Sequence, residues 1–233
     1  MAVHDQEHTS PIESGNLALD LLQLPGVRRL GDGAPSRAPG VPDAPPAWTR
    51  DELAGRLCEL SAGPDTAALA VAGTLVLDAQ LTGSPVAWVT ARAATFHPPD
   101  LAAMGVDLAA LVVVRAIDSR RAGRAADVLL RSGAFGLVVL ELGTSATLPA
   151  PPLSASLQGR LVQLATKHDA AVLCLTEKAA DAPSLGSLVS LRGQVRRRRT
   201  AEGFICELDI LKDKRRGPGW RWRERFRGPD GLH

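Results

Sequence analysis

The segment Arg56–Val71, RLCELSAGPDTAALAV, joins an apolar run to a Gly-Pro turn and an alanine-rich stretch of helical character. A strand that passes through a glycine-initiated turn into a helix is the layout of a phosphate-binding loop, where backbone N–H groups face a polyphosphate. That signature ends in Gly-Lys-Ser/Thr, whereas this chain ends in Ala68, Leu69 and Ala70. The sequence therefore predicts the shape of the loop without its chemistry. The degenerate loop comprises Gly63, Pro64, Asp65, Thr66, Ala67, Ala68, Leu69 and Ala70.

Apolar strands alternate with helical segments through the middle of the chain. The expected strands are Leu57–Leu60, Val86–Val89, Leu111–Val114, Phe135–Leu142 and Ala170–Leu175. The expected helices are Asp65–Leu81, Pro98–Met104, Arg120–Arg131 and Leu153–Lys167. Strands that are apolar on both faces and alternate with helices predict a parallel sheet in a doubly wound α/β domain.

Two further segments differ from this pattern. Ser187–Arg198 and Gly203–Lys212 alternate only in part, which predicts an antiparallel pair added at the edge of the sheet. In the helix at Arg120–Arg131, the apolar side is expected to hold Ala125, Val128 and Leu129.

Composition divides the chain into four parts. We expect a tail with a short helix at residues 1–30, a Gly/Pro/Ala-rich linker at 31–48, a core domain at 49–218 and a basic, Trp-bearing tail at 219–233. The N-terminal helix, Asn16–Leu24, is either an interaction arm or a fortuitous apolar cluster in a disordered tail. Its apolar residues are Leu17, Leu19, Leu21, Leu22 and Leu24.

The formal charge of +2 conceals a basic C-terminal region. Between Arg192 and Arg227 there are 13 Lys/Arg and 5 Asp/Glu, a local charge of +8, which leaves −6 on the rest of the chain. The candidate binding residues are Arg196, Arg197, Arg198, Arg199, Lys212, Lys214, Arg215, Arg216, Trp220, Arg221, Trp222 and Arg223. Arginines among aromatics suit single-stranded DNA or a protein partner. The third interpretation is a final strand with aromatics on the core edge and arginines in water.

Other functional classes lack support in the sequence. No Ser/His/Asp, Cys/His or metal-ligand spacing stands out, so we expect no catalytic residue, no metal and no cofactor. The cysteines Cys58, Cys174 and Cys206 lie far apart inside apolar runs and are expected to be buried thiols. The polar N-terminus and the absence of an apolar run of about 20 residues predict a cytoplasmic protein without a membrane partner.

Five segments, in order, resemble the RecA recombinase family, and within its superfamily most closely the ImuA-like accessory proteins of bacterial SOS mutagenesis. They are GVRRLGDG (Gly26–Gly33), GRLCELSAGPDT (Gly55–Thr66), GVDLAALVVVRA (Gly105–Ala116), RSGAFGLVVLELG (Arg131–Gly143) and FICELDILKDKRRGP (Phe204–Pro218). The resemblance implies a RecA-like parallel or mixed sheet flanked by helices, with C-terminal antiparallel strands and a short N-terminal helical arm.

The chain departs from the family where nucleotides are handled. The resemblance places Leu69 at the loop lysine, Arg92 at the water-activating Glu, Glu141 at the sheet-tip Asp and Glu177 at the phosphate-sensing Gln. Both DNA-binding loops also look shortened, around Thr144–Pro152 and Lys178–Gly186. We therefore expect neither an ATPase nor a recombinase, and a residual ATPase is the weakest hypothesis.

The resemblance implies a non-catalytic SOS-response protein that promotes mutagenic DNA damage tolerance. Its implied partners are RecA, an inactive Y-family polymerase homologue of the ImuB type and an error-prone replicative-type DNA polymerase. Residues 16–30 would dock on a RecA filament and cap or remodel it, with Lys212 and Lys214 near a subunit interface. The alternative is a single-stranded DNA-binding module that uses the basic C-terminal region.

Overall fold

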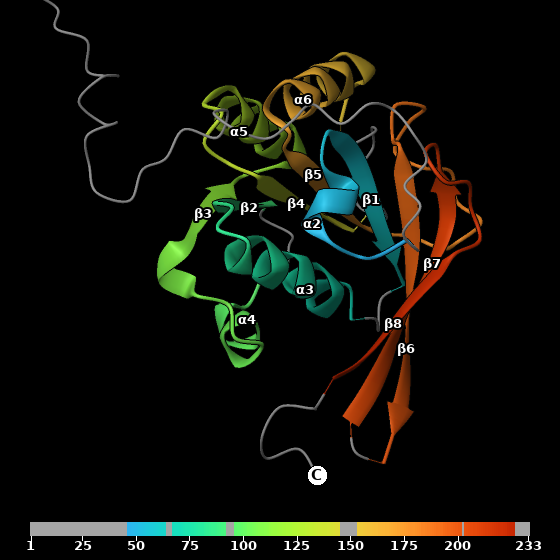
Figure 1. The fold of residues 1–233 in the computed structure, drawn as a ribbon. Helices are drawn as coiled ribbons and strands as arrows, with labels where there is room; N and C mark the ends of the chain where they lie inside the picture. Colours follow the sequence, from blue (N-terminus) through green and yellow to red (C-terminus); the bar gives the residue numbers. More distant parts are fainter. Residues whose placement is uncertain (1–45, 64–66, 92–95, 145–152, 202, 227–233) are drawn as a thin grey trace, which may run out of the picture. The chain divides into compact units, whose positions relative to one another are not determined.

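The chain forms a sheet of eight strands over its described residues, in the order β3-β2-β4-β5-β1-β6-β7-β8 (Figure 1). The computed structural model describes residues 46–63, 67–91, 96–144, 153–201 and 203–226. The chain divides into two units, Met1–Ala34 and Pro35–His233, and every described residue belongs to the second. The N-terminal helix predicted at Asn16–Leu24 and most of the predicted linker lie outside the described residues.

The elements follow the predicted alternation, with boundaries shifted by a few residues. The strands are β1 Arg56–Ala62, β2 Val86–Ala91, β3 Leu111–Ala116, β4 Leu137–Thr144, β5 Ala171–Glu177, β6 Leu191–Thr200, β7 Gly203–Asp213 and β8 Arg221–Phe226. The helices are α2 Arg50–Leu53, α3 Ala68–Leu81, α4 Pro98–Ala103, α5 Ser119–Arg131 and α6 Ala155–His168, with a 3₁₀ turn at Leu108–Ala110. The first six strands are parallel, and β7 and β8 each run antiparallel to the strand before.

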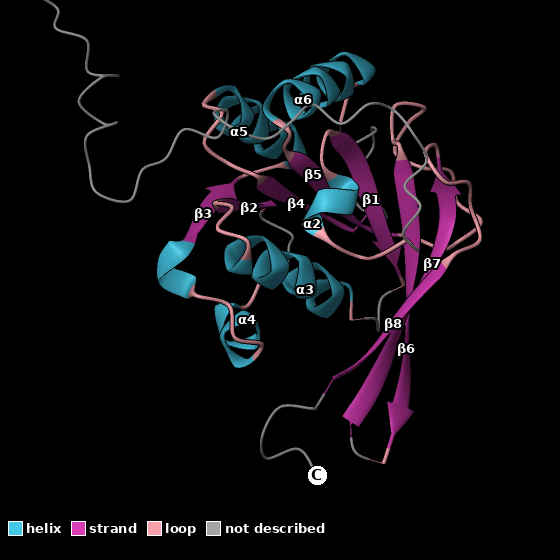
Figure 2. Ribbon diagram, in the orientation of Figure 1, coloured by secondary structure: helices cyan, strands magenta, loops and turns pink. Residues whose placement is uncertain are grey.

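Helices cover both faces of the parallel part of the sheet (Figure 2). On one face, α3 and α4 pack over one set of alternate strand residues, which include Leu60, Trp88 and Leu173. On the other face, α5 and α6 pack over the residues between them, which include Val138 and Cys174. Every residue of β1 and β2 is buried, so the prediction of strands buried on both faces is confirmed for the centre of the sheet.

The edge strand β3 does not fit that prediction. Val112 and Val113 retain 43% and 39% of their surface exposed, although Leu111–Val114 is as apolar as the central strands. The cause is topology, because β3 pairs only with β2 and its outer side has no neighbouring strand among the described residues. A short apolar run alone does not reveal whether a strand is central or at the edge.

Helix α5 buries a different stripe from the predicted one. Ala122, Ala126 and Leu130 are buried, whereas Val128 is 60% exposed. The predicted face, Ala125, Val128 and Leu129, was therefore wrong at its centre. The small residues explain the choice, because a Cβ on Gly123 would lie 2.6 Å from Leu157 of α6. The helices approach closely only where α5 carries Gly and Ala.

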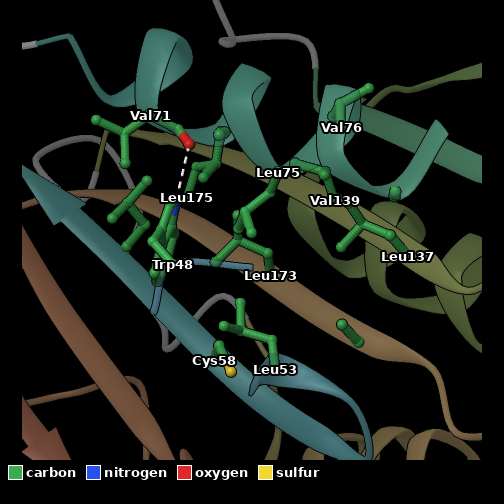
Figure 3. Packing of buried hydrophobic residues seen from close by; sticks show 14 of the residues in the cluster. Trp48, Leu53, Cys58, Val71, Leu75, Val76, Leu137, Val139, Leu173 and Leu175 are labelled. Carbon is green, nitrogen blue, oxygen red and sulfur yellow. Dashed lines mark hydrogen bonds between the residues drawn. The ribbon is translucent and has the colours of Figure 1, made fainter. Parts of the chain in front are cut away.

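The folded core begins before Thr49. Trp48 is 4% exposed, and its indole Nε1 donates a hydrogen bond of 3.0 Å to the carbonyl oxygen of Val71 in α3 (Figure 3). The same figure shows Leu75 and Leu173 packed beside it under the helix. Trp48, which the composition places at the end of the linker, is thus part of the core.

The cysteines are buried, as predicted. Burial raises the pKa of Cys58 to about 12 and that of Cys206 to about 11, and it raises the pKa of Cys174 well above its usual range. None of the three thiols is therefore suited to act as a thiolate nucleophile or a metal ligand near neutral pH.

A buried ion pair joins the start of β1 to the end of β7. Arg56 Nη2 lies 2.6 Å from Asp213 Oδ1, with 1% and 0% of the two side chains exposed. Asp213 also accepts hydrogen bonds from the Trp220 indole at 3.0 Å and from the Arg215 backbone N–H at 2.8 Å. Burial alone would raise the pKa of Asp213, but these hydrogen bonds and the Arg56 charge outweigh burial and lower it. Asp213 thereby fixes the turn that leads into β8.

A second ion pair extends this cluster to α2. The Arg216 guanidinium binds the Glu52 carboxylate through two atoms, at 3.0 and 2.7 Å, and both side chains are about nine-tenths buried. Arg215 Nη2 donates to the carbonyl oxygen of Ala54 at 2.7 Å. The connection between β7 and β8 is therefore tied to the N-terminal edge of the core by charged side chains.

The last strands extend past the rest of the sheet. The pairing of β6 with β1 ends at Val195, so that Arg196–Thr200 continues without β1 and pairs only with β7. We call the part formed by residues 196–201, 203–207 and 223–226 the arm. Figure 1 shows these strand ends reaching beyond α3 with no described helix beside them. The predicted C-terminal tail is, over Arg221–Phe226, the edge strand of this arm and its root.

Replacing Asp213 tests the ion pair. Asp213→Asn removes the nearest counter-charge of the buried Arg56, which keeps only the more distant Glu52 carboxylate at 3.7 Å, so we expect the free energy of unfolding at neutral pH to fall by about 3 kcal/mol, the lower end for a broken buried pair. Urea unfolding measures this loss, and Asp181→Asn, at an exposed aspartate, is the control. Because the folded pKa of Asp213 is depressed, its contribution is present above the ordinary value of about 3.9 and disappears as the pH falls through the folded value. A difference between wild type and Asp213→Asn that grew on acidification would contradict this account.

Candidate functional site

The end of β1 and the start of α3 flank the predicted degenerate phosphate loop. Gly63 follows β1, and α3 begins at Ala68 after Ala67, which makes no side-chain capping hydrogen bond. Leu69, which the resemblance places at the loop lysine, packs against the core beneath α3. Ala70 is half-buried. This end of the helix presents aliphatic side chains where a phosphate site presents an ammonium and a hydroxyl group. The loop residues Pro64, Asp65 and Thr66 lie outside the described residues.

Glu141 is held by the sheet itself. It lies near the end of β4, is 5% exposed, and its Oε2 accepts a hydrogen bond of 3.2 Å from the indole Nε1 of Trp88 in β2. The Trp88 ring in turn contacts Phe96, with 5.0 Å between the ring centroids. Aromatic side chains therefore occupy the space beside the carboxylate that was predicted at the sheet tip.

Glu177 lies at the same edge of the sheet. It ends β5, pairs in register with Ala62 of β1 and Thr144 of β4, and is half-buried. The structure thus brings Gly63, Glu141 and Glu177 to the carboxyl ends of the neighbouring strands β1, β4 and β5. Arg92, the fourth altered position, lies outside the described residues.

A buried polar network lies on the opposite face of β1 and was not predicted. Glu59 is fully buried and forms an ion pair with Lys178, while it accepts hydrogen bonds from Thr176 Oγ1 at 2.8 Å and from the Leu185 backbone N–H at 2.9 Å. Ser61 Oγ donates a hydrogen bond of 2.7 Å to Gln194 Oε1. The signal in the sequence was a carboxylate in the middle of an apolar run, because a buried charge requires a partner.

The network fixes the segment between β5 and β6, one of the two predicted shortened DNA loops. Arg192 donates to the carbonyl oxygens of Ala182 and Ala179, the latter at 2.9 Å, and to Ser61 Oγ at 3.1 Å. Gln158 Nε2 of α6 donates a hydrogen bond of 3.1 Å to the carbonyl oxygen of Leu185. Side chains from three elements therefore hold residues 178–190 in place. The other shortened loop, around Thr144–Pro152, lies mostly outside the described residues.

The predicted basic candidates fall into two groups, and the first is engaged within the fold. Lys212 Nζ and Lys214 Nζ donate to the carbonyl oxygens of Gly186 and Ser187, at 3.5 and 2.6 Å. Burial, together with the neighbouring Lys214 and Arg192, lowers the pKa of Lys212. Arg215 and Arg216 bind the α2 region as described above. Nothing in the sequence pattern distinguishes these four residues from the other basic candidates.

The second group lies on and beside the arm. Arg196, Arg197, Arg198 and Arg199 are exposed on β6, and Arg221 and Arg223 are exposed on β8. Trp220 and Trp222 are half-buried and pack against the core beneath α3. For β8, the structure matches the interpretation in which aromatics cover the core edge while arginines point to water. The leucines of the predicted N-terminal arm, Leu17, Leu19, Leu21, Leu22 and Leu24, lie outside the described residues.

Neither a metal site nor a membrane span is found in the described part of the chain. Among residues 46–63, 67–91, 96–144, 153–201 and 203–226, no three His, Cys, Asp or Glu side chains are placed to hold a metal ion. None of the described helices is both long and apolar enough to cross a membrane. Comparison of the sequence with protein-family models and with curated proteins gave no match.

Replacing Arg192 tests whether the polar network holds the 178–190 segment. Arg192→Met removes the donor to two carbonyl groups and to Ser61. We therefore expect the free energy of unfolding to fall by at least about 2 kcal/mol and the amides of residues 178–190 to exchange faster. Hydrogen-exchange mass spectrometry reads that segment directly. Arg197→Met, at an exposed arginine on the same strand, is the matched control. Unchanged exchange in this segment would show that the network does not fix it.

Proposed function

We propose that this chain is a RecA-like protein of the ImuA type that binds partners in DNA damage tolerance and does not process nucleotides. The observation that carries the proposal is the packing of Leu69 against the core at the position of the loop lysine. An aliphatic side chain there supplies no charge to a β- or γ-phosphate, and Ala70 supplies no ligand to Mg²⁺.

The other residues of this edge support the same conclusion. Glu141 is engaged by the Trp88 indole, and Glu177 would repel a phosphate. Lys178 directly follows Glu177, but its ammonium group is committed to Glu59 on the opposite face. The described residues of this edge therefore combine two carboxylates with apolar side chains, a poor environment for a polyphosphate.

The fold is consistent with the RecA-like architecture that the sequence resembles. A mostly parallel sheet lies between helices, the degenerate loop connects β1 to α3, and antiparallel strands follow at the C-terminal end. A loop that closes on DNA needs freedom to move. Residues 178–190, at the position of one such loop, are instead held by hydrogen bonds from Arg192 and Gln158. Retention of the fold without these activities favours a protein that acts through its surfaces.

The free edge of β3 offers one such surface. Val112 and Val113 are exposed on a strand whose outer backbone groups pair with no strand of the described chain. An edge of this kind can accept an extended segment of a partner through main-chain hydrogen bonds. The proposed partners are RecA, an inactive ImuB-like polymerase homologue and an error-prone replicative-type polymerase.

The absence of nucleotide chemistry is tested by titration with ATP. We expect no saturable heat when Mg²⁺–ATP is added to the full-length protein at up to millimolar concentrations, because Leu69 stands where the resemblance places the lysine that holds a β/γ-phosphate. Isothermal titration calorimetry makes the measurement, with purified RecA as the positive control. Saturable binding, or phosphate release above background, would overturn the pseudo-ATPase assignment.

The docking of the N-terminal segment on RecA is tested by pull-down with purified RecA. Two changes are compared with wild type: a truncated chain that begins at Pro46 and so keeps Trp48, and a full-length Leu17→Ser/Leu21→Ser/Leu24→Ser variant. We expect both to lose most of the bound RecA, since leucines at helical spacing form the expected contact face. Equal recovery of RecA by all three proteins would exclude the N-terminal arm as the docking element.

A further inference from the structure

The arm concentrates positive charge at its open edge. Its described residues include six arginines, Arg196–Arg199, Arg223 and Arg225, against two acidic residues, Glu207 and Glu224, a net charge of +4. Arg198, Arg199 and Arg223 form no ion pair with any described residue, whereas Arg196 and Arg221 flank Asp209 at 3.2 and 2.8 Å. The charge is thus available where β6 has left β1.

The four successive arginines of β6 point to both faces of the arm. Residues in a strand alternate between faces, so Arg196 and Arg198 share one face and Arg197 and Arg199 the other. Because β1 pairs only as far as Val195, alternate backbone N–H groups of Arg196–Thr200 also face an edge that no described strand covers. The open edge of β6 therefore carries backbone N–H groups, with arginine side chains on both faces of the strand beside them.

The aromatic residues of the arm are already in use. The rings of Phe204 and Phe226 stack with 5.6 Å between centroids, and the Arg197 guanidinium lies 5.8 Å from the centre of the Phe204 ring. Both phenylalanines, together with Trp222, are partly buried and pack against the core cluster that includes Cys206 and Leu208 of β7. The chemistry that the edge offers is therefore directed at phosphates and not at base faces.

We propose that the open edge of β6, Arg196–Arg199, binds the phosphate backbone of single-stranded nucleic acid. A rigid duplex meets one face of a sheet, whereas a single strand is flexible enough to bend around an edge and meet arginines on both faces. Arginines on one face recur about every 6.6 Å along the strand, which gives a repeated contact to a linear polyanion. This site goes beyond the protein-binding function proposed above and does not depend on it.

The test compares two variants of equal charge in the full-length protein. Arg197→Gln/Arg198→Gln/Arg199→Gln removes three cations from the open edge, and Arg120→Gln/Arg121→Gln/Arg124→Gln removes three exposed cations from α5. Fluorescence anisotropy with a labelled oligothymidylate measures affinity across a salt series. Thermal unfolding of both variants verifies that their folds are intact.

We expect the arm variant to bind about 100-fold more weakly at about 0.1 M salt, with the slope of log K against log salt reduced by about 2, since each single-strand phosphate contact contributes about 0.7. The α5 variant should bind as wild type does, and oligoadenylate should bind as oligothymidylate does. The proposal is overturned if wild type does not bind the oligonucleotide at low salt, if both variants lose affinity equally, or if a blunt duplex binds as tightly. Loss of RecA in pull-down by the arm variant without any oligonucleotide binding by wild type would assign the edge to a protein partner instead.

Discussion

The buried pair between Arg56 and Asp213 is the constraint on which the C-terminal half of the sheet depends. It joins the first residue of β1 to the last residue of β7, and Asp213 also holds Trp220 at the entrance to β8. The neighbouring pair between Glu52 and Arg216 attaches the same turn to α2. The loss of Arg56 would leave the Asp213 carboxylate desolvated, and the loss of Asp213 would leave Arg56 with only the more distant Glu52 carboxylate, at 3.7 Å. With the root of β6–β8 fixed in this way, the arm can extend beyond the helices and still keep its register.

The two ends of the sheet serve different purposes in this account. At the carboxyl ends of β1, β4 and β5 lie the apolar Leu69 and the carboxylates of Glu141 and Glu177, and the Trp88 indole donates a hydrogen bond to Glu141. At the arm, the exposed side chains of Arg196–Arg199 lie along an open strand edge. Other cations of the C-terminal region bind elsewhere in the fold. Arg215 and Arg216 bind the α2 region, and Arg192, Lys212 and Lys214 donate to carbonyl groups of residues 178–190.

Much of the fold was predictable, because its central strands are continuous apolar runs and because strands alternate with helices along the chain. Phe135–Leu142 and Ala170–Leu175 correspond to β4 and β5, since buried parallel strands leave a continuous apolar run. Features that depend on long-range contacts were not predictable. Val112 is exposed only because β3 is at the edge, and Val128 is exposed only because Gly123 brings α6 against another side of α5. Lys212 and Arg216 are engaged within the fold and Arg198 is exposed. This difference was not predictable either, because it depends on carbonyl and carboxylate partners distant in the sequence.

The central claim is that this fold is retained for its surfaces and not for nucleotide chemistry. The most direct measurement is a photocrosslinking map of the full-length protein, made in parallel with RecA and with single-stranded DNA, each in the presence and absence of ATP. The account predicts DNA crosslinks at the arm, RecA crosslinks elsewhere on the chain, and no change in either map on addition of ATP. Crosslinks of either partner concentrated at Gly63–Ala70, or a map that ATP rearranges, would contradict it.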